Sequence, residues 1–339
     1  MKRDDYVNND LKLFWLFRCT EKQYAVSFCK KGNIKFNTPK YWIEIEKKEG
    51  KGRGDLLEGV YASFPLLDSH NILKYRKKRN IVKGNTIGEI TYLRSDDILD
   101  MPSYCMFGLF NHSFKTQYFE ETQKWADVKY VTRDYFKDFY DYESREEIEN
   151  IPEEKQPVLL IIQSPNKFFE RIYNYFEKIG IKRNEVLIWP VRYLDKSKPF
   201  MTTSQFPSEL FLKDKCFEHQ SEVRIVINTK NKKALKKLRS ENYIINIGSL
   251  HDITQIYSYY LDDMLIEMDG MTLRHNLPEP IITDFEDLPK DELLGIAINL
   301  RNGNGKQLGV KDDNEVNSSL ELIDKILKDR YGIYSYYID

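Results

Sequence analysis

The apolar residues of this chain fall into short runs that polar segments separate. A run of this kind, bounded by turn residues, is typical of a buried strand. Most of the segments between these runs look too short for the helical crossover that joins parallel strands. The pattern therefore predicts an α+β fold in which a mostly antiparallel mixed sheet is flanked by helices. The strands are expected at residues 11–19, 104–110, 157–163, 223–227 and 261–268.

Glycine and proline mark the limits of two expected helices. Gly32 ends a helix over residues 21–31, and Pro39 opens another over residues 39–46. Glycine suits the left-handed residue after a helix, and proline suits the first helical position. Residues 114–154 are aromatic and charged, which favours a solvated helical face or a loop.

Chain length and charge limit organisation and function. A chain of 339 residues can bury a sizeable core, and we expect a main domain over residues 10–270 and a C-terminal extension with a closing helix over residues 271–339. The 52 basic and 53 acidic residues give a formal charge of −1, so the chain lacks an overall positive charge for nucleic acid. The basic residues 230–239 are either a solvated helix face or a phosphate-binding surface.

Residue spacing predicts neither a metal site nor a membrane segment. The cysteines form no C-x-x-C pair, and the histidines form no H-x-x-x-H or H-E-x-x-H step. The polar N-terminus lacks the apolar core of a signal peptide, and no apolar run has the length of a membrane span. These features lead us to expect a cytoplasmic protein with free thiols.

Charged side chains accompany apolar residues in two of the expected strands. Arg18 lies in the first strand, and Glu222 and Arg224 begin a later one. A buried carboxylate is costly unless it is paired or used. Glu222 is therefore either paired with a cation such as Arg224 or exposed to a cleft. Arg18 is open to two interpretations in the same way, a buried ion pair or a phosphate-binding guanidinium.

Two polar segments could complete a site with these charges. Thr202, Thr203 and Ser204 form a hydroxyl cluster that either lines a pocket or only turns the chain. The glycine-rich loop over residues 50–58 either binds a phosphate through Arg53 and its backbone N–H groups or is a surface turn.

The motifs near residues 16–42 and 217–227 resemble those of a large group of uncharacterised bacterial domains. The opening LFRCTEKQYAVSFCKKGNIKFNTPKYW resembles the Arg-bearing strand, helix and Gly-x-Ile-x-Phe strand that begin those domains. The segment FEHQSEVRIVI resembles their closing Glu-x-Glu-x-Arg strand, with Gln220 in place of the first acid. The group carries no settled activity.

A second resemblance is to mono-ADP-ribosyltransferases of the arginine–serine–glutamate type. Arg18, the hydroxyl cluster at residues 202–204 and the Gln220-x-Glu222 step occur in the order of that family's three motifs. The resemblance implies an ADP-ribosyltransferase-like core in which Arg18 holds the phosphates of NAD. It further implies that the hydroxyl cluster shapes the nicotinamide pocket, and that Gln220 and Glu222 orient the ribose and the acceptor.

These features lead us to expect an intracellular bacterial or phage protein of the toxin or antiviral-defence kind, which transfers ADP-ribose from NAD or cleaves NAD. Its partners would be a nucleotide ligand and a protein or nucleic-acid acceptor. Two alternatives stay open. One is a nuclease or nucleic-acid-binding effector that uses Arg53 and residues 230–239, and the other is a non-enzymatic assembly protein with tyrosine-rich interfaces. In an enzyme, Arg18 and Glu222 are expected on neighbouring strands, with both side chains on one side of the sheet.

Overall fold

The structure is a computed structural model. It describes residues 11–50, 54–65, 79–84, 90–202, 207–259, 261–269, 272–278, 280–281, 290–303 and 313–331.

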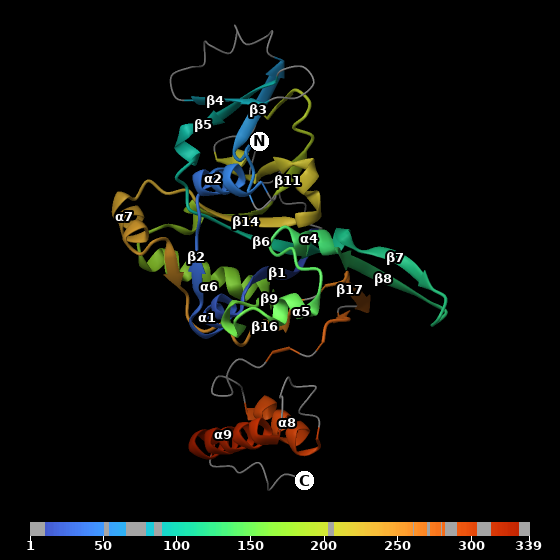
Figure 1. Ribbon diagram of the computed structural model, residues 1–339. Helices are drawn as coiled ribbons and strands as arrows, with labels where there is room; N and C mark the ends of the chain where they lie inside the picture. The colour runs from blue at the N-terminus through green and yellow to red at the C-terminus, as the bar shows by residue number, and fades with distance from the viewer. Residues whose placement is uncertain are drawn as a thin grey trace.

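A six-stranded sheet lies at the centre of the protein (Figure 1). Every neighbouring pair of its strands is antiparallel. The fold is therefore α+β, as the short apolar runs predict. In spatial order the strands are β10 (Val186–Pro190), β14 (Glu222–Ile227), β6 (Ser103–Phe110), β1 (Leu13–Glu21), β9 (Pro157–Ile162) and β16 (Thr254–Ser258).

Three helices cover one face of the central sheet. They are α1 (Lys22–Lys31), α6 (Pro165–Lys178) and α7 (Lys232–Ser240), and their buried side chains pack with alternate strand residues such as Leu16 and Leu160. α6 shows why a helix forms here. Its buried Phe168, Ile172 and Phe176 recur every four residues and so make one apolar stripe.

The opposite face of the central sheet packs against an aromatic layer. Trp15, Phe17 and Cys19 point to this face from β1, because side chains alternate along a strand. Two short helices, α4 (Arg133–Lys137) and α5 (Arg145–Glu149), cover them.

Within the described residues, four smaller sheets surround the central one. The two-stranded sheet of residues 192–194 and 212–214 is parallel. These sheets are β12 (Phe200–Met201) with β3 (Val60–Pro65), β5 (Ile90–Ser95) and β4 (Arg79–Gly84); β18 (Thr272–His275) with β17 (Met264–Asp269), β8 (Lys124–Val131) and β7 (Lys115–Phe119); β15 (Ile244–Asn246) with β2 (Asn33–Lys35); and β11 (Arg192–Leu194) with β13 (Leu212–Asp214).

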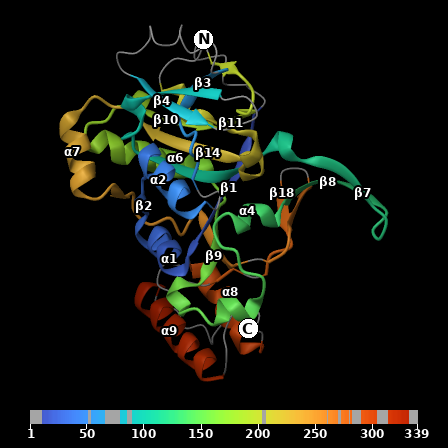
Figure 2. The same cartoon turned by 45° about the horizontal axis from the view of Figure 1, so that its top comes forward.

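Strands β7 and β8 form a long hairpin that projects from the body (Figures 1 and 2). Near its end, Trp125 is 70% exposed, and its ring centroid lies 5.2 Å from that of Tyr118. The prediction of a helical face or loop over residues 114–154 is therefore wrong for the first part of that segment. Its aromatic and β-branched residues suit strands, and β8 becomes one because it pairs with β17 on one side and with β7 on the other.

The C-terminal helices have an apolar core of their own. α8 (Lys290–Arg301) and α9 (Asp313–Tyr331) pack against each other through residues such as Leu293, Ala297 and Leu327. Backbone pairing of the main body continues past residue 270, because β18 pairs with β17 and the Ile281 N–H donates to Ile256 O. In the parts of the chain that are described, no helix is long and apolar enough to cross a bilayer.

The helix limits marked by glycine and proline are confirmed. Thr38 caps α2 (Pro39–Glu49), its hydroxyl accepting from the Tyr41 N–H, and Pro39 opens the helix. Gly32 ends α1 and Gly50 ends α2, both with positive φ, 61° and 62°. The surroundings of these two glycines differ. A Cβ on Gly32 would stand 2.2 Å from the carbonyl oxygen of Gly248, whereas a Cβ on Gly50 would meet nothing within 4 Å.

This difference predicts unequal effects for the same substitution. Gly50→Ala should cost about 1–2 kcal/mol, which is the cost of a left-handed alanine. Gly32→Ala should cost clearly more, because the methyl group also collides with a backbone carbonyl. Urea unfolding of both variants measures the difference. Equal losses of stability would show that the close approach of Gly32 to Gly248 does not add to the free-energy cost of the substitution.

Candidate functional site

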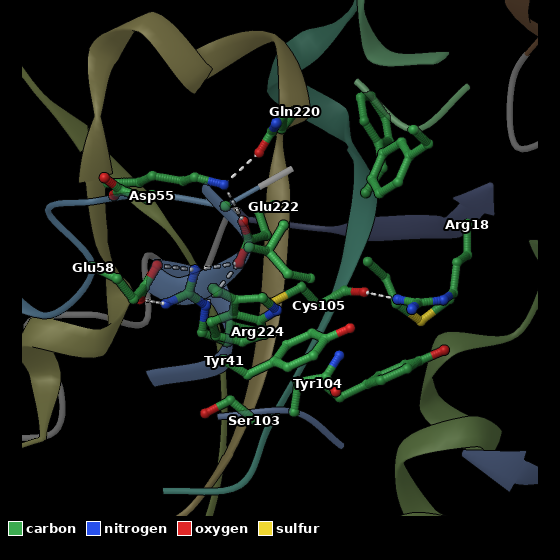
Figure 3. A pocket seen from close by; sticks show the side chains of 18 of the residues that line it. Arg18, Tyr41, Asp55, Glu58, Ser103, Tyr104, Cys105, Gln220, Glu222 and Arg224 are labelled. Atoms are coloured by element: carbon green, nitrogen blue, oxygen red, sulfur yellow. Dashed lines mark hydrogen bonds and ion pairs between the residues drawn. The ribbon is translucent and has the colours of Figure 1, made fainter. Parts of the chain in front are cut away.

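A pocket lies where the central sheet opens beside β6 (Figure 3). β14 pairs with β6 from Ser103 to Phe107. β1, on the other side, has its last pair with β6 at Phe17 and Phe107. Among the described residues, a bridge to Asn37 is the only further backbone pairing on that side. The pocket has a volume of about 120 Å³, with walls from β1, α2, β6, α4, β13, β14 and the segment before β3.

Arg18 stands at this opening, one residue beyond the last pair of β1 with β6. Its Nη1 donates to Cys105 O at 2.7 Å, and the guanidinium carbon lies 4.6 Å from the ring centroid of Tyr104. Among the described residues, no carboxylate forms an ion pair with Arg18. Burial by itself lowers the pKa of Arg18, but Tyr104 and other neighbours raise it, and the net direction is upward. The group is therefore a permanent cation with N–H donors left for an anion.

Glu222 belongs to a buried network of charges on the other side of β6. Its Oε1 accepts from Arg224 Nε at 2.7 Å, and its Oε2 lies 3.1 Å from Lys213 Nζ. Arg224 also pairs with Glu58. Burial by itself raises the pKa of Glu222, but the charges of Arg224 and Lys213 outweigh it and lower the pKa to about 2. Glu222 is thus paired with Arg224 and also forms part of the pocket wall. The two alternatives drawn from the sequence, an ion pair and a position at a cleft, therefore apply at the same time.

The thiol of Cys105 lies between Arg18 and this network (Figure 3). Burial, and then the negative charge of Glu222, raises the pKa of Cys105 well above its ordinary value. The group therefore stays a thiol and can act as a weak donor to Glu222. Arg224 and Lys213 act in the opposite direction, but burial and Glu222 outweigh them, so a nucleophilic thiolate is disfavoured.

A turn in left-handed conformation brings Gln220 and Glu222 to the pocket. A 3₁₀ helix over Lys215–Gln220 ends at Ser221, which has φ 40°. The Ser221 hydroxyl donates to Gly108 O at 2.8 Å, and the Gly108 N–H donates back to Ser221 O at 2.8 Å. This double contact fixes the start of β14 against β6.

Asp138 ties Gln220 and His219 to the end of α4. Its Oδ2 accepts from Gln220 Nε2 and lies 2.7 Å from His219 Nε2. The other ring nitrogen, Nδ1, lies 3.1 Å from Cys216 O. A carboxylate and a carbonyl can only accept, so both ring nitrogens are placed to donate, an arrangement that favours the imidazolium form of His219. The hydrogen bond with Asp138 is the main cause that raises the pKa of His219, and Asp134 adds to it.

Three of the predicted site residues, Arg18, Gln220 and Glu222, line one pocket. Thr203, Ser204 and Arg53 lie outside the described residues. Of the hydroxyl cluster, Thr202 is described, and its hydroxyl donates to Tyr61 O at 3.1 Å, beside β12.

The relative orientation of Arg18 and Glu222 differs from the expectation. Their strands are near neighbours, since both pair with β6. Glu222 is paired with Phe107, and Phe107 with Phe17, so Glu222 shares a face with Phe17 and the adjacent Arg18 points to the other face. The expectation that both side chains lie on one side of the sheet is therefore wrong. β6 lies between their strands, and the pocket reaches both side chains at the part of β6 that β1 no longer pairs with.

Sequence reasoning missed the cations and acids that complete the network. Lys213 lies on the short, mixed β13, where no apolar pattern marks a buried position. Glu58 ends the loop in which Arg53 was considered for phosphate binding, yet its own role is to pair with Arg224. Asp55 of the same loop lies 3.5 Å from the buried Lys196. The sequence signal for this network was the pair of acids, Asp55 and Glu58, just before the strand β3.

Comparison of the chain with protein-family models, with curated proteins and with solved structures found no match. Over the described residues, no group of three or more His, Cys, Asp or Glu side chains could hold a metal ion.

The charge network predicts that Glu222→Gln destabilises the protein. The substitution leaves Arg224 and Lys213 with one carboxylate fewer in a buried cluster, which should cost about 3–5 kcal/mol. Glu170→Gln is the matched control, because Glu170 pairs with Arg183 at the surface, where both side chains are about half exposed. Chemical unfolding compares the two. Similar small losses in both variants would contradict a structural role for the network.

The imidazolium of His219 predicts a pH-dependent stabilisation. Its pKa is raised in the folded state, so the stabilisation is complete below the unfolded-state pKa of about 6.5 and is lost as pH rises through the folded-state value. The difference in Tm between the parent protein and His219→Gln should therefore be largest in mildly acidic buffer and shrink in alkaline buffer. His112→Gln, at an exposed histidine, is the control. A difference that stays constant with pH would rule out the double protonation.

Proposed function

We propose that the pocket binds NAD and that the protein transfers ADP-ribose to an acceptor or cleaves NAD. The observation that carries the proposal is that Arg18, which pairs with no carboxylate of the described residues, lines one pocket with Gln220 and Glu222. Activity of this kind would suit a bacterial or phage toxin or antiviral-defence protein.

Arg18 supports the binding of phosphate. Its guanidinium donates to a backbone carbonyl and lies over the ring of Tyr104, and no carboxylate of the described residues neutralises it. A planar guanidinium presents paired N–H donors that match two phosphate oxygens. The diphosphate of NAD is a ligand of this kind.

The size of the pocket limits how much of the ligand it encloses. A volume of about 120 Å³ is close to the roughly 150 Å³ that holds one benzene ring. It is below the roughly 300 Å³ at which pockets for larger ligands begin. The pocket is therefore no larger than one ring, and part of the nicotinamide would enter it against aromatic side chains of its wall such as Trp42 and Tyr135. The remainder of the dinucleotide would lie outside.

Glu222 would act as a carboxylate throughout. With a pKa of about 2 it cannot serve as a general acid near neutral pH. A fixed negative charge can accept a hydrogen bond from a ribose hydroxyl and stabilise positive charge that develops on the ribose. In the reaction, the bond between C1′ and the nicotinamide nitrogen breaks, and nicotinamide leaves with the bonding electrons. A water molecule or an acceptor group then bonds to C1′ and releases a proton.

The pairing of Glu222 with Arg224 and Lys213 is compatible with this role. Two cations hold the carboxylate in one orientation, which favours preorganisation. The same two cations neutralise the charge of the Glu222 carboxylate. A purely structural role for Glu222 is therefore the competing explanation. The experiment must therefore separate stability from activity.

The test measures NAD binding and nicotinamide release together. NAD should raise the Tm of the parent protein, because a ligand at about 100 times its Kd adds about 2.7 kcal/mol to the stability of the folded state. The shift should disappear in Arg18→Ala and be kept in Arg171→Ala, since Arg171 pairs with Asp252 on the surface. Glu222→Gln, assayed well below its own Tm, should release nicotinamide at least about 100-fold more slowly.

Two results would overturn the proposal. The first is the absence of both a Tm shift and nicotinamide release at millimolar NAD. The second is a loss of activity in Glu222→Gln that only follows the unfolded fraction, which would leave Glu222 with a structural role alone.

A further inference from the structure

The helix α7 carries its charges in an arrangement that costs stability. Lys232 and Lys233 occupy its first turn, which contains no acidic residue, although the positive end of the helix dipole lies there. Lys232 and Lys236 are four residues apart, as are Lys233 and Lys237, and like charges at this spacing repel each other. For a helix whose exposed side only contacts solvent, this arrangement of lysines brings no stabilisation.

The four lysines share one side of α7. Ala234 and Leu238 are buried against the core of the central sheet, and Lys232, Lys233, Lys236 and Lys237 are exposed. Helical geometry places Lys232 and Lys236 opposite Ala234 and Leu238, and Lys233 and Lys237 on the adjoining flank. The helix therefore presents a continuous cationic side to solvent.

A second segment adds cations at the N-terminus of α7. The Asn231 side chain donates to Gly180 O at 2.9 Å, and the Thr229 hydroxyl donates to Glu185 at 2.9 Å. These bonds hold the loop after α6 beside the start of α7, so the exposed Lys178 and Lys182 join the exposed Lys230. We call these three lysines and the four of the helix the α7 surface.

Few acidic groups neutralise the α7 surface. Within the described chain, its only ion pair is that of Lys237 with Glu241, at 3.9 Å. Glu241 also accepts from Tyr175, and Glu185 is occupied by Thr229 and the Lys182 N–H. Glu177, next to Lys178, acts on Arg183. The surface is thus strongly positive on a chain with a net charge of −1.

We propose that the α7 surface binds the phosphate backbone of a nucleic acid. Lysines act as point charges on phosphates, and they carry little information about base sequence. The apolar side of α7 is used by the core, so the helix cannot insert into a lipid surface as an amphipathic helix does. The proposal is independent of the NAD pocket. Glu222 is the first residue of β14, and Lys230 follows the last residue, Ile227. The five residue steps from Glu222 to Ile227 span about 17 Å.

The experiment measures binding of labelled single-stranded and duplex DNA of about 20 nucleotides between about 50 and 200 mM salt. Fluorescence anisotropy gives the association constant at each salt concentration. The logarithm of this constant should fall linearly with the logarithm of the salt concentration, with a slope of about −3 to −5 for four or five phosphate contacts. Lys232→Glu with Lys236→Glu should weaken binding at least about tenfold at low salt and reduce the slope by about 2.

The matched control is Lys124→Glu with Lys325→Glu, which changes the net charge equally at two exposed lysines on β8 and α9. This control should keep the affinity of the parent protein. Equal losses in both double variants, or no binding at low salt, would overturn the proposal. Binding to anionic lipid vesicles without binding to DNA would overturn it as well. None of these outcomes depends on NAD.

Discussion

The buried guanidinium of Arg224 connects four parts of the chain that are far apart in sequence. It pairs with Glu222 on its own strand and with Glu58 before β3, donates to Leu210 O, and lies 5.0 Å from the ring centroid of Trp42 in α2. Only 1% of the side chain is exposed. A buried charge of this kind is tolerated when its partners are complete. The position of α2 and of the segment before β3, and hence of the pocket wall, therefore depends on this cation.

Local sequence patterns predicted much of the fold and two residues of the candidate site, Arg18 and Glu222. Short apolar runs identified the antiparallel strands, and Gly32 and Pro39 marked helix limits, because backbone preference acts within a few residues. Arg18 and Glu222 were found because a charge in an apolar strand conflicts with its surroundings. Glu58 and Lys213 could not be found in this way. Their importance comes from contacts with Arg224 and Glu222, and no local pattern encodes which distant residue will supply the partner.

The opening of the sheet could not be predicted either. It arises because β1 continues along β9 after it has left β6. Among the described residues, no strand then lies beside that part of the β6 edge, while the sheet as a whole stays continuous. Side-chain alternation in the sequence gives the face of each residue but not the length of each pairing. For this reason the expected common face of Arg18 and Glu222 was wrong, although both side chains line the same pocket.

The left-handed conformation of Ser221 has a consequence for how this protein can vary. Residues with a β-branched side chain rarely adopt a positive φ, whereas glycine, asparagine and aspartate do so readily. The position between Gln220 and Glu222 therefore accepts a short list of residues for reasons of backbone geometry, even though its own side chain does no chemistry. Relatives of this chain would be recognised as much by a small or polar residue at this step as by the charges on either side of it.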